Sequence, residues 1–221
     1  MENYPNFTTV IFQTLRELVL SLLNTTYNCA YNIGINNYPL EIPYFTIVLE
    51  PYCRCPDIAI SFFAKMILAM VQDVLMDADF EIFKLRKEEL DEIILAVNEP
   101  SVSTDGVVGI FEYTFSSEEV LFALKHLLSC RANIEMLLGM DIIPSLLSFM
   151  HYSNPAVKTL ACHLLLVLLM ESSFKQTFLR SDLPLLEALQ ELAQSTASEV
   201  KSIALCTLEE LGYSDTEGMF I

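Results

Sequence analysis

The 221-residue chain has no tryptophan, only six glycines and nine prolines, and few basic residues. β-Sandwiches and β-barrels need many turn residues, so this scarcity argues against both folds. Twelve lysines and arginines stand against 29 acidic residues, and the net charge of −17 repels phosphate backbones. Nucleic acid is therefore not an expected partner. The acidity is typical of a solvated surface and also suits a basic partner, and charge patterning does not choose between them.

Signal-peptide and disulfide patterns are missing as well. The first ten residues, MENYPNFTTV, lack the basic segment of a signal peptide. The six cysteines, at positions 29, 53, 55, 130, 162 and 206, do not form the framework of a small secreted domain. We therefore expect free thiols and a cytoplasmic location. The apolar runs 58–76 and 160–170 carry charges or are too short to span a membrane, so buried helices and no membrane span are predicted.

Motifs of catalysis and of metal binding are also absent from the sequence. It contains no glycine-rich phosphate loop and no G-x-S-x-G. Cys53 and Cys55, with Cys29 nearby, have the wrong spacing for a zinc site. The three histidines form no His-x-x-His set, and the acidic run 88–92 is predicted to be the solvated face of a helix. We expect a protein that is not an enzyme and uses no cofactor or metal.

Helical periodicity is what the sequence does contain. Apolar residues at spacings of three and four predict helices over 6–24, 57–76 and 80–97, and an almost continuous helical region over 116–211. Four prolines between residues 27 and 57 predict an ordered loop or extended connector there, and residues 101–114 are a second break. Asp57 is a candidate N-cap, and Ser116 with Glu119 fits a capping box.

The helical region contains an internal repeat. The segments VLFALKHL at 120–127, ACHLLLVL at 161–168 and ALCTLEEL at 204–211 follow one another at offsets of 41 and 43 residues. In each, the first, fourth, fifth and eighth positions are small or apolar, apart from one Thr, which is the stripe that a helix buries. Between them, Gly139 fits the end of a helix, and Pro144 and Pro184 fit the start of the next one.

This period and pattern resemble the armadillo repeat, A-x-x-A-L-x-N-L followed by G-x-I-P-x-L-x-x-L, over residues 118–211. The resemblance implies an all-α fold, a right-handed α-solenoid with a non-repeat helical cap at the N-terminus. Residues 1–79 would be the cap, with the proline-rich connector at about 27–57; residues 80–213 would be the repeats and 214–221 a tail. Residues 83–211 are also similar to armadillo regions of multidomain animal signalling proteins, including ones that carry Toll/interleukin-receptor domains.

The family binds partners along its concave face, which implies a row of contact residues in this chain. Peptide-binding members carry Asn at the seventh position of the block, where this chain has His126, Val167 and Glu210. An apolar row with histidines suits a partner helix or folded domain better than an extended peptide. The expected contact row is Phe122, His126, Thr159, His163, Val167, Ser202, Cys206 and Glu210. Coverage of this row by the protein's own loops is the alternative.

The function that the resemblance implies is a non-enzymatic scaffold or adaptor. The alternative is a regulatory or oligomerising armadillo module of a signalling protein that lacks its effector domain. An uncapped solenoid end exposes its core, so residues 205–211 are expected to favour a homo-oligomer.

Overall fold

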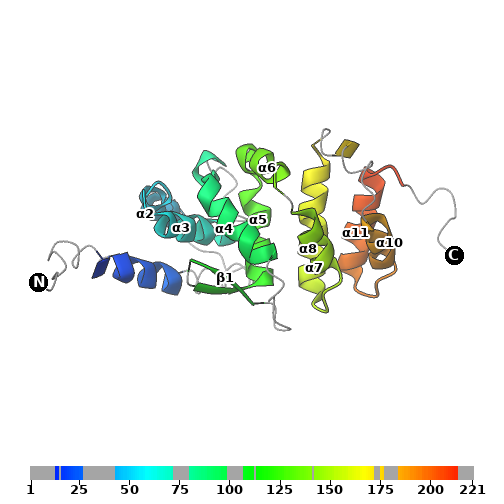
Figure 1. Ribbon diagram of the computed structural model, residues 1–221, viewed down its shortest axis with the longest axis horizontal. Coiled ribbons are helices and arrows are strands. Elements are labelled where there is room, and N and C mark those ends of the chain that lie inside the picture. Colours follow the sequence, from blue (N-terminus) through cyan, green and yellow to red (C-terminus); the bar gives the residue numbers. More distant parts are fainter. Residues whose placement is uncertain are drawn as a thin grey trace, which may run out of the picture. The chain divides into compact units, whose positions relative to one another are not determined.

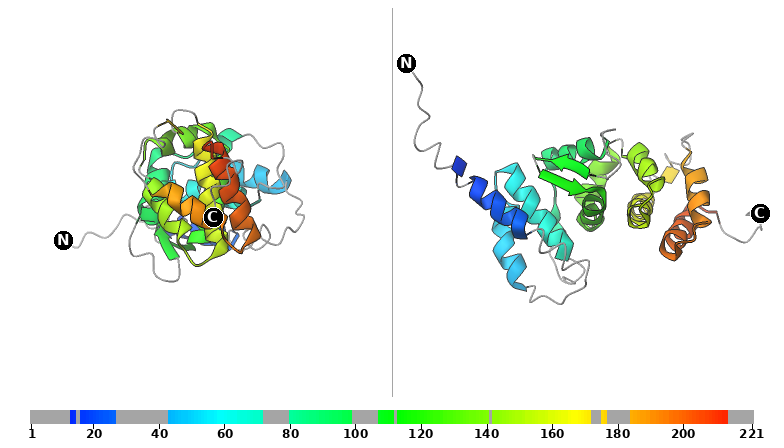
Figure 2. Two further views of the ribbon diagram at one scale, coloured as in Figure 1. Left: turned by 90° about the vertical axis from the view of Figure 1, so that its right-hand side faces the viewer. Right: turned by 90° about the horizontal axis from the view of Figure 1, so that it is seen from below.

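The computed structural model describes residues 13–14, 16–26, 43–71, 80–98, 107–111, 113–140, 142–171, 175–176 and 184–213. These residues are mostly helical, with two short strands, which confirms the all-α class. They belong to two compact units, Met1–Glu89 (unit 1) and Leu90–Ile221 (unit 2), and each is described on its own below (Figures 1 and 2).

Unit 1 is built around α3 (Ile58–Val71), a helix that is buried on every side. All residues from 59 to 69 are buried, including the polar Ser61 and Lys65. α2 (Pro43–Cys53) packs against α3, and the short 3₁₀ helix η2 (Phe80–Phe83) contacts both. Residues 16–26 form a further helix, which is tied to the start of α3 by an ion pair between Arg16 Nε and Asp57 Oδ2 at 2.6 Å. The buried helix predicted for this apolar run is confirmed over 58–71, and residues 72–79 lie outside the described part.

α2 shows that the connector prediction was wrong over residues 43–53. Pro43 is the first residue of the helix, where a missing N–H costs nothing, and Pro51 is the third residue from its end. Pro51 has no N–H to bond back along the helix, and α2 ends two residues later, so proline density did not prevent a helix here. The chain then leaves the helix, and Asp57 caps α3 as predicted, accepting from the Ile60 N–H at 3.1 Å. Residues 27–42 lie outside the described part.

The single helix predicted over 80–97 is in fact two elements. η2 is followed by a non-helical link, residues 84–86, and by α4 (Lys87–Asn98), which crosses the boundary between the units at Glu89. The link ends where the Glu89 carboxylate accepts a hydrogen bond from the Arg86 N–H at 2.7 Å, which gives α4 an N-terminus of its own. Glu89 is fully buried, so the prediction of a solvated face over 88–92 was wrong at this residue.

After the last residues of α4, unit 2 contains a β-hairpin that the sequence did not predict. β1 (Val107–Ile110) pairs antiparallel with β2 (Tyr113–Ser116), with Val108 opposite Phe115. Val108, Ile110 and Phe115 are buried, so the hairpin contributes one apolar face to the core. The alternation is only four residues long in each strand, too short to be separated from a loop by periodicity.

The helices of unit 2 pack in series. They are α5 (Ser117–Leu127), α6 (Arg131–Leu138), α7 (Ile143–Met150), α8 (Pro155–Leu169), α10 (Leu185–Ala193) and α11 (Ser198–Glu210). α8 contacts both α5 and α11, while α7 packs on α8 and α10 packs on α11 (Figure 1). The repeat segments thus lie in α5, α8 and α11, and all twelve stripe positions are buried: Val120, Ala123, Leu124, Leu127, Ala161, Leu164, Leu165, Leu168, Ala204, Thr207, Leu208 and Leu211.

The helix ends of unit 2 follow the local sequence signals. Ser116 Oγ accepts from the Glu119 N–H at 3.1 Å and Glu119 Oε2 accepts from the Ser116 N–H at 2.6 Å, so the capping box is confirmed. Gly139 is the C-cap of α6 and Pro144 stands in the first turn of α7, also as predicted. Asn133 is a buried residue that the sequence did not single out; its amide donates to the Leu127 carbonyl at 2.6 Å and satisfies the end of α5.

Candidate functional site

The contact row predicted from the repeat is distributed over three helices, α5, α8 and α11, and α8 packs against both of the others. Phe122 and His126 lie on α5. Thr159, His163 and Val167 are spaced by four on α8, and Ser202, Cys206 and Glu210 are spaced by four on α11. Seven of these eight side chains are half-buried or exposed, and His126 is buried. The name contact row is kept below for these eight residues.

The α5 part of the contact row is closed. The ring centroids of Phe122 and His126 are 4.8 Å apart, and His126 is only 6% exposed. Phe122 covers the imidazole from the same helix face and is itself half-buried. At His126 the alternative stated for the contact row, coverage by the protein's own residues, therefore describes the structure better than direct contact with a partner.

The α8 part of the contact row is partly open and carries little charge. Burial, together with the positive charge of Lys125 on α5, lowers the pKa of His163 below its usual value. The imidazole is therefore neutral at neutral pH and offers one donor and one acceptor. Thr159 Oγ1 donates to the Pro155 carbonyl at 3.0 Å, which leaves its methyl group and the Val167 side chain as apolar contact area.

The α11 part of the contact row is the most exposed. Ser202 and Cys206 are exposed, and Glu210 is half-buried and paired with Lys175, whose Nζ lies 2.9 Å from Glu210 Oε1. The exposed core expected at residues 205–211 is not found, because Leu208 and Leu211 are buried and Leu205 is half-buried. That part of the argument for self-association through the end of the repeats was wrong.

Unit 1 has an apolar groove that the sequence did not reveal. Its volume is about 370 Å³, and it is lined by Val19, Leu22 and Leu23 on helix 16–26 and by Val48, Leu49 and Tyr52 on α2. Leu22 and Val48 are each 60% exposed. The predicted helix over 6–24 is confirmed for the described residues 16–24, and two of its apolar residues, Leu18 and Leu22, are exposed. Because α2 forms one wall of the groove, the prediction of a connector in its place gave no reason to expect a groove.

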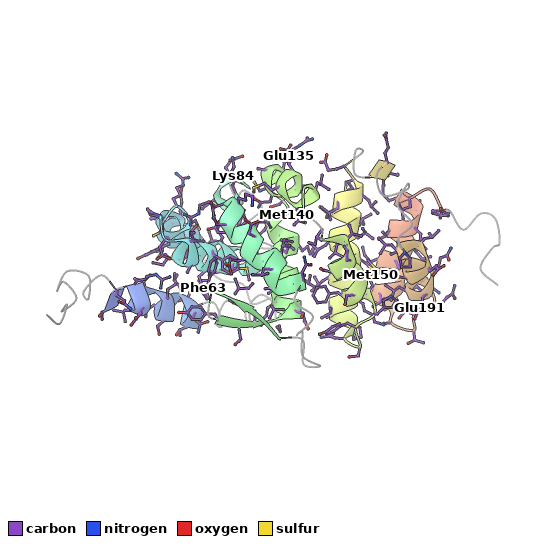
Figure 3. The ribbon with its side chains drawn as sticks, in the orientation of Figure 1. Phe63, Lys84, Glu135, Met140, Met150 and Glu191 are labelled. Atoms are coloured by element: carbon purple, nitrogen blue, oxygen red, sulfur yellow. The ribbon has the colours of Figure 1, made fainter. Side chains whose placement is uncertain are left out.

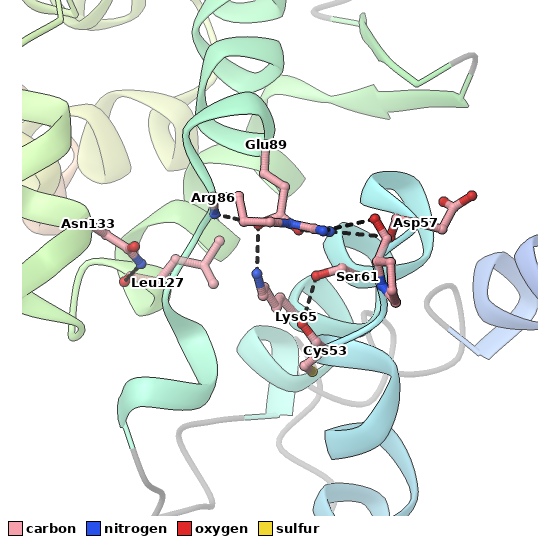
Figure 4. Close-up of polar contacts among 9 residues, drawn as sticks. Cys53, Asp57, Ser61, Lys65, Arg86, Glu89, Leu127 and Asn133 are labelled. Atoms are coloured by element: carbon pink, nitrogen blue, oxygen red, sulfur yellow. Dashed lines mark hydrogen bonds and ion pairs between the residues drawn. The ribbon is translucent and has the colours of Figure 1, made fainter.

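A second concavity of unit 1, of about 470 Å³, is lined largely by charged side chains, and we call it the basic pocket. It lies between residues 53–55 at the end of α2, Lys65 on α3, and residues 81–82 and 84–88. Lys65, which is 3% exposed, reaches the fully buried Glu89 at 2.6 Å (Figure 4). Arg86 joins the same carboxylate through Nη2 at 3.1 Å. Lys84 belongs to the pocket's rim and precedes α4 (Figure 3).

The cysteines of the rejected zinc motif belong to the wall of the basic pocket. Cys53 is buried, and burial raises the pKa of its thiol to about 12, so it is not ionised at neutral pH. Cys55 is a half-buried free thiol, and Cys29 lies outside the described residues. Within the described ranges, no group of three or more His, Cys, Asp or Glu residues is placed to hold a metal ion.

No single helix in the described part of the chain is long and apolar enough to cross a membrane. α6 and α7 reach the required length and apolar composition only when they are taken together, and the chain bends by 97° between them.

Comparison with known proteins adds no family to this description. The sequence matches no protein-family model, and no curated protein matches it significantly.

Proposed function

We propose that unit 2 is a non-enzymatic protein-binding module, a scaffold or adaptor with the architecture of a right-handed armadillo-type solenoid. The observation that carries the proposal is the series α5, α8 and α11, in which every stripe position of the repeat is buried and the contact row stays largely accessible. Stacked helices of this kind bury one face against their neighbours and present another as an extended surface.

The contact row suits a helix or a folded domain as its partner. Its centre, on α8, combines the Val167 side chain with a neutral imidazole at His163, and its α11 end adds the exposed Ser202 and Cys206. An extended peptide needs regularly spaced groups that bond its backbone. The row offers His126, Val167 and Glu210 at the equivalent positions; the first is buried, the second is apolar and the third is paired with Lys175.

The test is a comparison of two double substitutions that each add two positive charges to exposed residues. Ser202→Arg/Cys206→Arg alters the contact row, and Gln194→Arg/Ser196→Arg alters the turn between α10 and α11. Proteins captured from a cell extract are quantified by mass spectrometry for both variants and for the unchanged protein. We expect the first variant to lose its captured partners by about tenfold, an interface effect of about 1.4 kcal/mol, and the second to keep them.

The proposal fails if the turn variant loses the partners while the contact-row variant keeps them. Equal thermal melting of the two variants is the control for folding, and it should be met because all four substituted residues are exposed.

Self-association through unit 1 is a second candidate, and the apolar groove is the observation that favours it. The groove is hollow, while Leu18 and Ile47, which adjoin its lining residues in the sequence, are 56% and 68% exposed. A two-fold interface between identical chains needs a patch that is complementary to itself, and a hollow beside projecting apolar side chains meets that need. The occupant of the groove would then be a second copy of the chain.

Sedimentation velocity tests this candidate. We expect a dimer that Leu22→Glu/Val48→Glu converts to a monomer, whereas Ser21→Glu/Thr25→Glu, which adds the same charge to exposed residues of helix 16–26, leaves the dimer intact. A monomer at every concentration for the unchanged protein contradicts it.

A further inference from the structure

The basic pocket concentrates positive charge in a chain that has very little of it. Five of the twelve lysines and arginines line this one concavity: Arg54, Lys65, Lys84, Arg86 and Lys87. Two carboxylates, Glu81 and Glu88, are the acidic members of the lining. Glu89, which pairs with Lys65 and Arg86, adds a third carboxylate, so the pocket with its ion pairs has an excess of two positive charges, although the whole chain carries −17. Solvent and salt screen charges beyond about 8–10 Å, so the field inside the pocket is set by its own wall.

In the floor of the pocket, the buried Lys65 and the half-buried Arg86 share one buried carboxylate, that of Glu89. Glu89 Oε2 accepts from Lys65 Nζ at 2.6 Å and from the Arg86 N–H at 2.7 Å, and Glu89 Oε1 accepts from Arg86 Nη2 at 3.1 Å (Figure 4). One carboxylate thus serves two cations. Burying charge is costly unless it is compensated, so the remaining positive charge is better stabilised when an anion approaches from the open side.

Arg86 is held in place by the backbone as well as by Glu89. Its Nη1 donates to the Pro56 carbonyl at 3.0 Å and its Nη2 to the Asp57 carbonyl at 3.3 Å. Its Nε is buried and has no hydrogen-bond partner among the described residues. On Lys65, the bond to Glu89 uses one of three Nζ donors. The two fixed cations therefore retain donor capacity beyond the contacts that hold them.

The other three cations of the lining are exposed to solvent and therefore accessible to a ligand. Lys84, Lys87 and Arg54 are exposed, and Arg54 forms an ion pair with the half-buried Glu50 at 2.8 Å. An exposed pair of this kind is weak and is readily exchanged for a stronger anion. Cys53 does not offset the positive charge, because its buried thiol stays protonated.

We propose that the basic pocket binds a small phosphorylated molecule. A phosphate group offers several acceptor oxygens and more than one negative charge, which suits a fixed guanidinium beside lysine ammonium groups. The volume of about 470 Å³ lies in the range of small-molecule sites, and the pocket is concave, so a compact ligand fits better than a polymer. A long phosphate backbone would also meet the net charge of the chain outside the pocket, which repels it.

Calorimetric titration of the full chain with inorganic tripolyphosphate, with ATP and with a phosphoserine peptide tests the proposal. Lys84→Gln/Lys87→Gln removes two rim cations without touching the buried ion pair. Lys158→Gln/Lys201→Gln removes two cations of α8 and α11 and is the charge-matched control. We expect tripolyphosphate or ATP to bind at about 0.1 M salt, where the screening length is about 10 Å. The pocket variant should bind about tenfold more weakly, and the control within about twofold.

Three results would overturn the proposal. The first is no binding of tripolyphosphate or ATP to the unchanged protein. The second is equal weakening in both variants, which would show attraction to net charge rather than to the pocket. The third is binding of the phosphoserine peptide alone, which would assign the pocket to a modified protein partner. Because the site lies in unit 1, each of these results leaves the proposal for unit 2 standing.

Discussion

Unit 1 and unit 2 place their charged residues in opposite ways. Unit 1 buries Lys65 and Glu89 at 3% and 0% exposure around a helix that is covered on all sides. In unit 2 the twelve stripe positions are uncharged, and its best-defined polar contacts, such as the capping box at Ser116, are at helix ends. Buried charge stabilises only when its partners are correctly placed, whereas an apolar stripe tolerates small errors. Unit 1 is therefore expected to be the more sensitive to single polar substitutions.

Lys65→Met gives the largest expected effect. It leaves the fully buried Glu89 with Arg86 as its remaining cation among the described contacts, and breaking a buried pair costs about 3–5 kcal/mol. Hydrogen exchange in α3 should accelerate by the corresponding factor. Lys84→Met, at an exposed position, should leave exchange almost unchanged. The double change Lys65→Met/Glu89→Gln removes the charge but keeps an oxygen that can accept from the Arg86 N–H, so it should restore much of the loss; if it is as unstable as Lys65→Met alone, the unpaired charge is not the cause.

Leu165→Ala in unit 2 should cost about 2–5 kcal/mol, because the residue is fully buried between neighbouring helices and its loss leaves a cavity. The matched change Leu95→Ala removes the same atoms from a side chain that is 60% exposed and should cost less than about 0.5 kcal/mol. Urea denaturation followed by circular dichroism measures both. Equal destabilisation by the two substitutions would contradict the packing of α8 described above.

Ser116→Ala should have a smaller effect, about 1 kcal/mol, because it removes the hydroxyl that accepts from the Glu119 N–H at the start of α5. Ser116→Thr retains that acceptor and should recover most of the stability. Thermal melting of the two variants checks the prediction, and a Thr variant no better than the Ala variant would count against the capping box.

The smallest expected effect is a dependence of stability on pH, which falls in a different pH range for each unit. The pKa of His163 in unit 2 is lowered by burial and by Lys125, so the unfolded chain binds this proton more tightly. The stability that the neutral imidazole contributes is present above the ordinary pKa of about 6.5 and is lost as the pH falls below it. His163→Gln should remove this step from melting temperatures measured between about pH 5 and 7.5. If the pH-dependent step in melting temperature remains in His163→Gln, another titrating group causes it.

Asp57 in unit 1 responds at lower pH. Burial raises its pKa, but the hydrogen bond from Arg16 and the backbone N–H donors outweigh burial and lower the pKa below its usual value. Its contribution is therefore present above the ordinary pKa of about 3.9 and is lost only as the pH falls through the lowered value. Asp57→Asn should reduce the loss of unit 1 stability at low pH, measured by melting temperature, and should leave the pH-dependent step of His163 unchanged.

The sequence predicted unit 2 better than unit 1, and the reason is the range of the interactions involved. The stripe positions, the capping box and the placement of Gly139 and Pro144 depend on neighbours within one or two helical turns, and all were confirmed. The hairpin at 107–116 was missed because each strand has only four residues.

In unit 1 the decisive contacts join residues that are far apart in the sequence. Lys65 and Glu89 are 24 positions apart, and Arg86 bonds carbonyls 29 and 30 residues away. One signal was available: a single lysine inside IAISFFAKMILAMV needs a buried acidic partner. The sequence does not say which of the 29 acidic residues that partner is. Glu89 lies in an acidic run whose pattern predicts the solvated face of a helix. The basic pocket depends on this pairing and was missed with it.

α4 has a consequence for dissecting the protein. It runs from Lys87 to Asn98, and the boundary between the compact units falls after Glu89, within its first turn. A cut there would remove the capping carboxylate and the first turn from unit 2, and leave unit 1 with a three-residue stub that cannot sustain a helix, because helix formation requires several consecutive turns. The boundary after Glu89 is therefore not a place at which the two units can be separated without loss, because α4 contributes residues to both.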